Sequence, residues 1–165
     1  MKKTAKKKQV VVATSGGFDP LHVGHVRCIQ EAAKLGDKLI VIVNGDEWLR
    51  RKKGYVFMDA KQRMEMILAI KGVDEVVEFD DGTPYVSGAL RKIRPDIFAK
   101  GGDRTSPANV GEWETCQEIG CKIVFGVGKG GKVESSSWLL DRFLGNAQKI
   151  KSPVKITVKE KARRH

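Results

Sequence analysis

Two histidines and three glycines gather in the stretch GGFDPLHVGH, residues 16–25. The stretch follows a run of β-branched residues and precedes a segment with helical spacing, so it should form the turn from a strand into a helix. A helix that begins near residues 21–23 presents unpaired amides and the positive end of its dipole at that turn. Gly16, Gly17 and Gly24 let an anion approach the backbone closely. The stretch therefore predicts a binding site for nucleotide phosphates.

His22 and His25 should share one face of the first helical turn, since they lie three residues apart. Two imidazoles on one face can donate hydrogen bonds to a phosphoryl oxygen on which negative charge develops. An isolated pair has other interpretations: one ring can cap the helix while the other packs in the core, or both can bind zinc. No cysteine pair stands at a suitable zinc-site spacing from them. The strand–glycine–helix context favours the phosphate site.

A second basic segment, RRKKG at residues 50–54, should lie at the same end of the sheet. We expect a flexible loop there. It can be a solvated surface, or a mobile clamp that brings Lys52 or Lys53 onto a triphosphate as a point charge.

The stretch GVGKGGK, residues 126–132, has the spacing of a Walker phosphate loop. Val133 stands where that motif needs a serine or threonine, and the stretch follows the last expected strand rather than the first. We therefore interpret it as a glycine-rich loop that brings Lys129 and Lys132 toward the site. The serines that follow, Ser135, Ser136 and Ser137, can cap the last helix or donate hydrogen bonds to phosphates.

Strands alternate with helices along the rest of the chain. The expected strands are residues 9–15, 37–46, 75–79, 96–103 and 121–127, and the expected helices are residues 25–36, 59–70, 84–93, 108–119 and 135–145. This alternation predicts an α/β fold: a single Rossmann-like, doubly wound domain whose five-stranded parallel sheet has the order 3-2-1-4-5 and helices on both faces. Ligands of such sheets bind where the winding reverses, here between the first and fourth strands. GGFDPLHVGH and KGGDR should then face one crevice, as in an enzyme.

The net charge of +11 is confined to the two ends of the 165-residue chain. Residues 1–9 carry +5 and residues 149–165 carry +6, so the intervening residues are formally neutral. We predict a basic tail at 1–9, a single folded domain at 10–146 and a second basic tail at 147–165. The tails are interpreted as solubilising ends rather than as nucleic-acid or membrane-surface contacts.

The three cysteines are few and odd in number, which argues against a disulfide framework and for a reducing compartment. No apolar run is long enough to span a bilayer or to serve as a signal peptide. We expect a cytoplasmic protein with no membrane partner.

With these residues identified, the chain resembles the cytidylyltransferase-like nucleotidyltransferase superfamily over about residues 10–145. GGFDPLHVGH matches its G-x-F-D-x-x-H-x-G-H signature, and SSS looks like its second, looser signature of serines and threonines. Within the superfamily the chain most resembles the adenylyltransferase domain that activates heptose 1-phosphate, through AAKLGDKLIVIVNGDE, QRMEMILAIKGVDEVVEFDDGTP and RPDIFAKGGD. Glycerol-3-phosphate and phosphoethanolamine cytidylyltransferases are similar to a lesser degree.

The resemblance implies roles for individual residues. His22, His25 and Lys53 are implied as catalytic groups on the phosphates. The implied nucleotide-binding residues are Gly17, Phe18, Asp19, His22, Gly24, His25, Gly101, Gly102, Asp103, Ser135, Ser136 and Ser137. The implied acceptor-binding residues are Asn44, Asp46 and Arg63. Two departures are notable: many members carry threonine in place of Gly17, and residues 104–132 are longer and richer in glycine and lysine than expected.

The implied reaction is attack by an acceptor phosphate on the α-phosphorus of a nucleoside triphosphate. AMP transfer from ATP to a sugar 1-phosphate is favoured, and CTP-dependent transfer to an alcohol phosphate such as glycerol 3-phosphate is the alternative. Mg²⁺ is expected on the triphosphate, with no dedicated protein metal site. A different class, a protein that binds a partner through its tails, also remains. The strand-like stretch VKITVK, residues 154–159, can pair across a homodimer.

Overall fold

The structure is a computed structural model that describes residues 8–101, 106–128 and 134–147. Its centre is a parallel sheet in the order β3-β2-β1-β4-β5, which confirms the predicted fold class and strand order. The strands are β1 (Val11–Gly16), β2 (Lys38–Asn44), β3 (Glu75–Phe79), β4 (Ile97–Gly101) and β5 (Lys122–Val127). β2 and β1 are buried through most of their length, as central strands of a parallel sheet must be.

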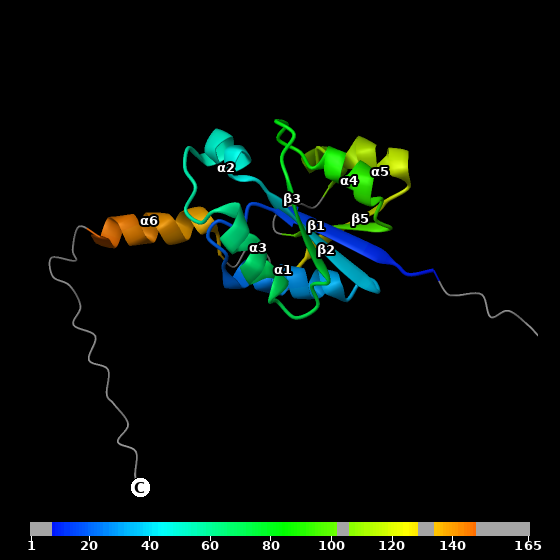
Figure 1. Cartoon of the computed structure of the whole chain (residues 1–165), viewed down its shortest axis with the longest axis horizontal. Helices are drawn as coiled ribbons and strands as arrows, with labels where there is room; N and C mark the ends of the chain where they lie inside the picture. The colour runs from blue at the N-terminus through cyan, green and yellow to red at the C-terminus, as the bar shows by residue number, and fades with distance from the viewer. Residues whose placement is uncertain (1–7, 102–105, 129–133, 148–165) are drawn as a thin grey trace, which may run out of the picture.

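Helices cover both faces of this sheet (Figure 1). The helices are α1 (Val23–Ala33), α2 (Asp46–Lys53), α3 (Ala60–Leu68), α4 (Ser87–Ile93), α5 (Trp113–Ile119) and α6 (Ser136–Ala147), with a 3-10 turn η1 (Pro107–Asn109) before α5. Figure 1 shows α1 and α3 below the sheet and α4 and α5 above it. α6 extends away from the body of the domain, beyond the beginning of α3.

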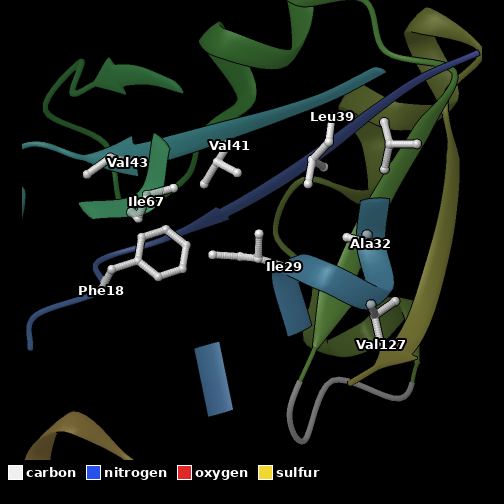
Figure 2. Close-up of a cluster of buried hydrophobic side chains, with 10 residues drawn as sticks. Phe18, Ile29, Ala32, Leu39, Val41, Val43, Ile67 and Val127 are labelled. Carbon is white, nitrogen blue, oxygen red and sulfur yellow. The ribbon is translucent and has the colours of Figure 1, made fainter. Parts of the chain in front are cut away.

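The core on the α1 and α3 face contains the first residue of functional interest, Phe18 (Figure 2). Its ring packs with Ile29 of α1, Val43 of β2 and Ile67 of α3, and 5% of the residue is exposed. A side chain on Gly16 would meet this ring at 2.9 Å, so the glycine allows the close turn. Phe18 has a left-handed backbone (φ 51°), which stores strain in the turn that carries the histidines. The core thus fixes the loop at the end of β1.

One predicted element is wrong: residues 50–54 are not a flexible loop. They form the last turn of α2 and its C-cap, Gly54, whose φ is 82°. Trp48 and Leu49 bury this short helix against the domain, and Asp46 and Glu47 begin it while four basic residues end it, which complements the helix dipole. The sequence pattern hid the helix because only two of its eight residues are apolar.

Two predicted helices also start later than expected. Residues 84–86 precede α4, which begins at Ser87. The segment 108–119 is divided into η1 and α5, because Val110 is extended between them and Gly111 packs against the ring of Tyr85. The remaining predicted strands and helices match the observed ones to within a few residues at their ends. Most of both predicted tails, together with VKITVK, lies outside the described residues.

Candidate active site

The two histidines lie at the N-terminus of α1 and cap it reciprocally. The Nδ1 atom of His22 accepts a hydrogen bond from the backbone amide of His25 at 3.4 Å, and the Nδ1 atom of His25 accepts one from the amide of His22 at 3.3 Å. The two rings stack with centroids 3.6 Å apart. The capping interpretation of His22 is therefore correct, and the capping leaves both rings at the helix terminus.

This arrangement fixes the protonation of the pair. A neutral imidazole that accepts at Nδ1 carries its proton on Nε2 and can donate from there. Burial lowers the pKa of His25 to about 3, with smaller contributions from His22 and Lys53. Burial also lowers the pKa of His22, against the opposing effect of Glu134. Both rings are thus neutral Nε2–H donors at neutral pH.

Asp19 and Lys53 connect the histidine loop to α2 and to the segment that follows it. Asp19 is completely buried, and its carboxylate accepts hydrogen bonds from the amides of Phe57 and Met58 at 2.8 and 2.7 Å. Lys53 donates to the backbone oxygen of Asp19 at 2.9 Å, and burial lowers the pKa of its ammonium. Both groups lie beside the histidines, with Lys53 close enough to lower the pKa values of both rings.

Arg63 of α3 is completely buried and joins four segments through its guanidinium. It donates to the backbone oxygens of Gly17 at 2.6 Å, Asn44 at 2.8 Å and Met58 at 2.9 Å, and to the carboxylate of Asp46 at 2.6 Å. Four of its five N–H groups are therefore used within the protein. Arg63 holds the ends of β1 and β2 together beneath the site.

Two of the implied acceptor residues lie at or just after the end of β2, and their side chains have little exposure to solvent. Asn44 is the last residue of the strand and is 6% exposed. Asp46 begins α2 and pairs with Arg63. Asp46, Glu47, Glu78 and Asp80 also line a cavity of about 450 Å³ between α2 and β3. Its lining combines four carboxylates with one guanidinium, that of Arg51, and this excess of negative charge disfavours a triphosphate there.

The serines at the start of α6 contact the histidine loop. The Ser136 hydroxyl donates to the backbone oxygen of Pro20 at 2.9 Å, and Ser135 accepts from the amide of Trp138 at 3.1 Å. The capping interpretation therefore holds for Ser135. Ser136 attaches the N-terminus of α6 to the loop, and Ser137 is exposed beside it.

Gly101, at the end of β4, is packed tightly against α1 and β5. A side chain there would clash with the thiol of Cys28 and lie 2.8 Å from the backbone oxygen of Val127. This glycine lets the end of β4 pack closely against the middle of α1. Gly102 and Asp103 lie outside the described residues, as do Lys129 and Lys132.

Three polar residues near the site have no counterpart among the sequence predictions: Ser15, Lys100 and Glu112. Lys100 precedes Gly101 and forms an ion pair with Glu112 at 3.3 Å. Strand alternation in IFAKG could have assigned the face of Lys100, but the contact with Glu112 depends on how α5 packs.

The described part of the chain contains no group of three or more His, Cys, Asp or Glu side chains that could hold a metal ion. Within the same residues, no helix is both long and apolar enough to cross a membrane.

Comparison with known proteins identifies a matching family model and several curated relatives. A family model described as Cytidylyltransferase-like matches residues 13–129. The bifunctional protein HldE of Syntrophotalea carbinolica is 40% identical over 109 residues, covering 65% of this chain and 22% of that protein. HldE of Methylococcus capsulatus is 46% identical over 95 residues, covering 56% of this chain and 20% of that protein. The chain thus spans about a fifth of the length of these curated relatives.

Two solved structures share the fold. The lipopolysaccharide core biosynthesis protein of Thermoplasma volcanium has a TM-score of 0.64 and 29% identity, over 73% of this chain and 98% of that one. Thermotoga maritima TmcAL, solved with alpha-thio ATP, has a TM-score of 0.60 over 84% of this chain and 51% of that one. Its 14% identity supports the fold alone.

Proposed function

The chain belongs to the cytidylyltransferase-like family of nucleotidyltransferases, and from this premise we propose that it transfers AMP from ATP to a sugar 1-phosphate. The observation that carries the proposal is the pair of neutral imidazoles at the N-terminus of α1, each with Nδ1 occupied by a backbone amide. The likeness to HldE proteins and to a lipopolysaccharide core biosynthesis protein supports a sugar phosphate as acceptor.

The reaction is an in-line displacement at the α-phosphorus. An anionic oxygen of the sugar phosphate forms the new P–O bond, the bond from the α-phosphorus to the bridging oxygen breaks, and pyrophosphate leaves with that electron pair. A phosphate monoester has a second pKa of about 6, so the attacking oxygen is already ionised at neutral pH. The protein therefore needs no general base, which fits a histidine pair that remains neutral.

The protein contributes by orienting the triphosphate and stabilising the charge that develops on it. His22 and His25 donate from Nε2, and the first amides of α1 with the positive end of its dipole face the same position. Lys53 supplies the positive charge beside them, and Ser137 is available from α6. Mg²⁺ accompanies ATP as part of the substrate and neutralises its phosphate oxygens.

The implied acceptor residues take different tasks in this proposal. Asn44 contacts the acceptor, whereas Arg63, which is fully buried and bonded to Gly17, Asn44 and Asp46, acts as a positioning residue. We further propose a cytoplasmic location.

The nucleotide is tested by the melting temperature of the full chain with ATP, CTP, GTP or UTP, each with Mg²⁺. A ligand that binds only the native state raises that temperature. We expect the largest shift with ATP. A shift with CTP alone overturns AMP transfer and favours cytidylyl transfer to an alcohol phosphate.

A matched control uses the variant Lys92→Met, since Lys92 is an exposed residue of α4 far along the chain from the histidines. It should respond to ATP as the unmodified chain does. No shift with any of the four nucleotides, in a chain that melts cooperatively, rejects the proposed function.

A further inference from the structure

A row of polar side chains crosses the α4 and α5 face of the sheet, close to the carboxyl ends of three adjacent strands. Side chains alternate along a strand, so residues two apart share a face. Ala13, Ile42 and Phe98 pack in the cluster that includes α4 and α5. Two residues further along their strands are Ser15, Asn44 and Lys100, which therefore lie on that same face of β1, β2 and β4. We call these three residues the polar row.

Lys100 is held in the polar row by several contacts. Its Nζ atom lies 3.3 Å from a carboxylate oxygen of Glu112 and 3.4 Å from the hydroxyl of Ser15, and 4.4 Å from the centre of the Phe98 ring. The side chains of Lys100 and Glu112 are 13% and 7% exposed. The other oxygen of Glu112 accepts from the backbone amide of Val86 at 3.3 Å. The amide of Val86 thus holds the Glu112 carboxylate in place, and that carboxylate holds the ammonium of Lys100.

Asn44 has a feature that points to a ligand. Its Oδ1 atom is buried and, among the described residues, has no hydrogen-bond partner. An unpaired buried carbonyl is costly, and a group that donates a proton to it relieves that cost. A ligand group that contacts Asn44 Oδ1 should therefore be a hydrogen-bond donor.

The charges of the row decide between two kinds of ligand group. Lys100 and Glu112 are neutral as a pair, and a phosphate dianion beside them would meet a carboxylate. A hydroxyl can both donate and accept, so it can bridge an ammonium, a serine hydroxyl and an amide oxygen. The first amides of α1 and the positive charge of Lys53 lie at the histidines, and α1 packs on the opposite face of the sheet. The row therefore suits hydroxyls better than a phosphate.

We propose that the polar row binds the hydroxyl groups of the acceptor, and so selects a polyhydroxylated phosphate ester. Ser15, Lys100 and Asn44 contact those hydroxyls, and Glu112 is the positioning residue that orients Lys100. This inference rests on the proposed nucleotidyl transfer, and it divides the crevice: the triphosphate lies on the α1 face and the sugar ring on the α4 and α5 face, with the attacking phosphate between them.

The test compares two acceptors in the full chain with ATP and Mg²⁺. One is the sugar 1-phosphate that the unmodified chain turns over best. The other is methyl phosphate, which has no hydroxyl group, measured as a competitive inhibitor of the sugar phosphate. Ser15→Ala and the double variant Lys100→Met/Glu112→Gln should raise the KM of the sugar phosphate about tenfold or more. Both should leave the KM for ATP and the inhibition constant of methyl phosphate within about twofold.

The double variant removes both charges together, so that no unpaired carboxylate remains buried. Lys92→Met serves as the control for the loss of a lysine and should change none of the constants. If the KM of the sugar phosphate is unchanged in both variants, the polar row does not bind the acceptor. An equal loss for methyl phosphate overturns the choice of hydroxyls. The unmodified chain could also turn over no sugar phosphate while ATP still raises its melting temperature. That result would contradict a sugar phosphate as the acceptor, and with it the proposed role of the polar row.

Discussion

The stacked imidazoles of His22 and His25 depart from the usual expectation that histidines near phosphates are cationic. Each Nδ1 atom accepts a backbone hydrogen bond, and burial disfavours protonation of both rings. Positive charge at the site comes instead from Lys53 and from the start of α1. The site is thus organised around neutral donors that are oriented before any ligand arrives.

Substitution of His25 by alanine should lower kcat by about two to three orders of magnitude, because a donor to the developing charge is lost. The KM for ATP should change less. His25→Asn, which retains a donor, should recover part of the loss. Steady-state rates of pyrophosphate release measure all three proteins. Turnover of His25→Ala that equals that of the unmodified chain would contradict the role of this ring.

The pH dependence of stability follows from the same burial. His25 has a pKa of about 3 when folded and an ordinary value near 6.5 when unfolded. Between these values the unfolded chain binds more protons than the folded one, so stability falls as the pH falls from 6.5 toward 3. The slope from this group is at most about 1.4 kcal/mol per pH unit. Urea unfolding at several pH values should show a smaller slope for His25→Gln, whereas identical slopes would show that the ring is protonated in the fold.

At the residue scale, the sequence predicted which side chains lie near the histidine loop but not their hydrogen-bond partners. Lys53 and Ser136 contact the histidine loop as expected, because the segments that follow parallel strands meet at one edge of the sheet. The burial of Arg63 could not be predicted, because it depends on carbonyl groups that come from two other strands. The Lys100–Glu112 pair was missed for the same reason.

At the scale of elements, the site depends on α2 and α3, which hold the ends of the two central strands. α2 was missed because its pattern shows one apolar pair, Trp48 and Leu49, amid charged residues. Its tertiary support comes from Trp48, which donates to the backbone oxygen of Pro84 at 3.2 Å. Within the helix, Lys52 lies 4.4 Å from the centre of the Trp48 ring. The contact with Pro84 has no signature in a local sequence window.

Replacement of Arg63 by methionine should destabilise the fold by about 3–5 kcal/mol, since the partly buried carboxylate of Asp46 and several carbonyls lose their donor. The melting temperature should fall by about 10 °C or more. Arg91→Met is the matched control, because Arg91 pairs with Glu118 at the surface, and its loss should leave the melting temperature nearly unchanged. Equal effects of the two substitutions in thermal unfolding would contradict the assigned role of Arg63.

The junction of β4 with α1 should be equally sensitive to added volume. Gly101→Ala should lower stability by about 1–3 kcal/mol, because the new methyl group meets Cys28 and a backbone oxygen. Gly145→Ala in α6 adds the same group in open space and should not lower it. Denaturant unfolding distinguishes the two, and tolerance of alanine at position 101 would show that the junction is loose.

At the scale of the whole molecule, the alternation of strands and helices was sufficient to predict the sheet order, because right-handed crossovers allow few arrangements. That order places the ends of β1 and β4 together at the winding reversal, with α1 and its histidines on one face of the sheet and the polar row on the other. The charge of +11 has no part in this arrangement, since it belongs to the two ends of the chain.

Removal of residues 1–7 and 148–165 should therefore leave kcat and both KM values within about twofold. The charge that it removes lies outside the formally neutral segment that carries the site. Turnover of the shortened chain, compared with the full chain at equal concentration, is the measurement. A loss of turnover that accompanies a change of mass in solution would assign the tails to assembly instead.

The central claim is that this chain joins AMP to a sugar phosphate, and mass spectrometry of the products tests it most directly. The chain is incubated with ATP, Mg²⁺ and a set of sugar 1-phosphates, and the nucleotide products are identified. We expect an ADP-sugar in an amount equal to the pyrophosphate released, and little of either with His25→Ala. Formation of AMP or ADP without a sugar nucleotide, or of a CDP-linked product only when CTP is supplied, would contradict it.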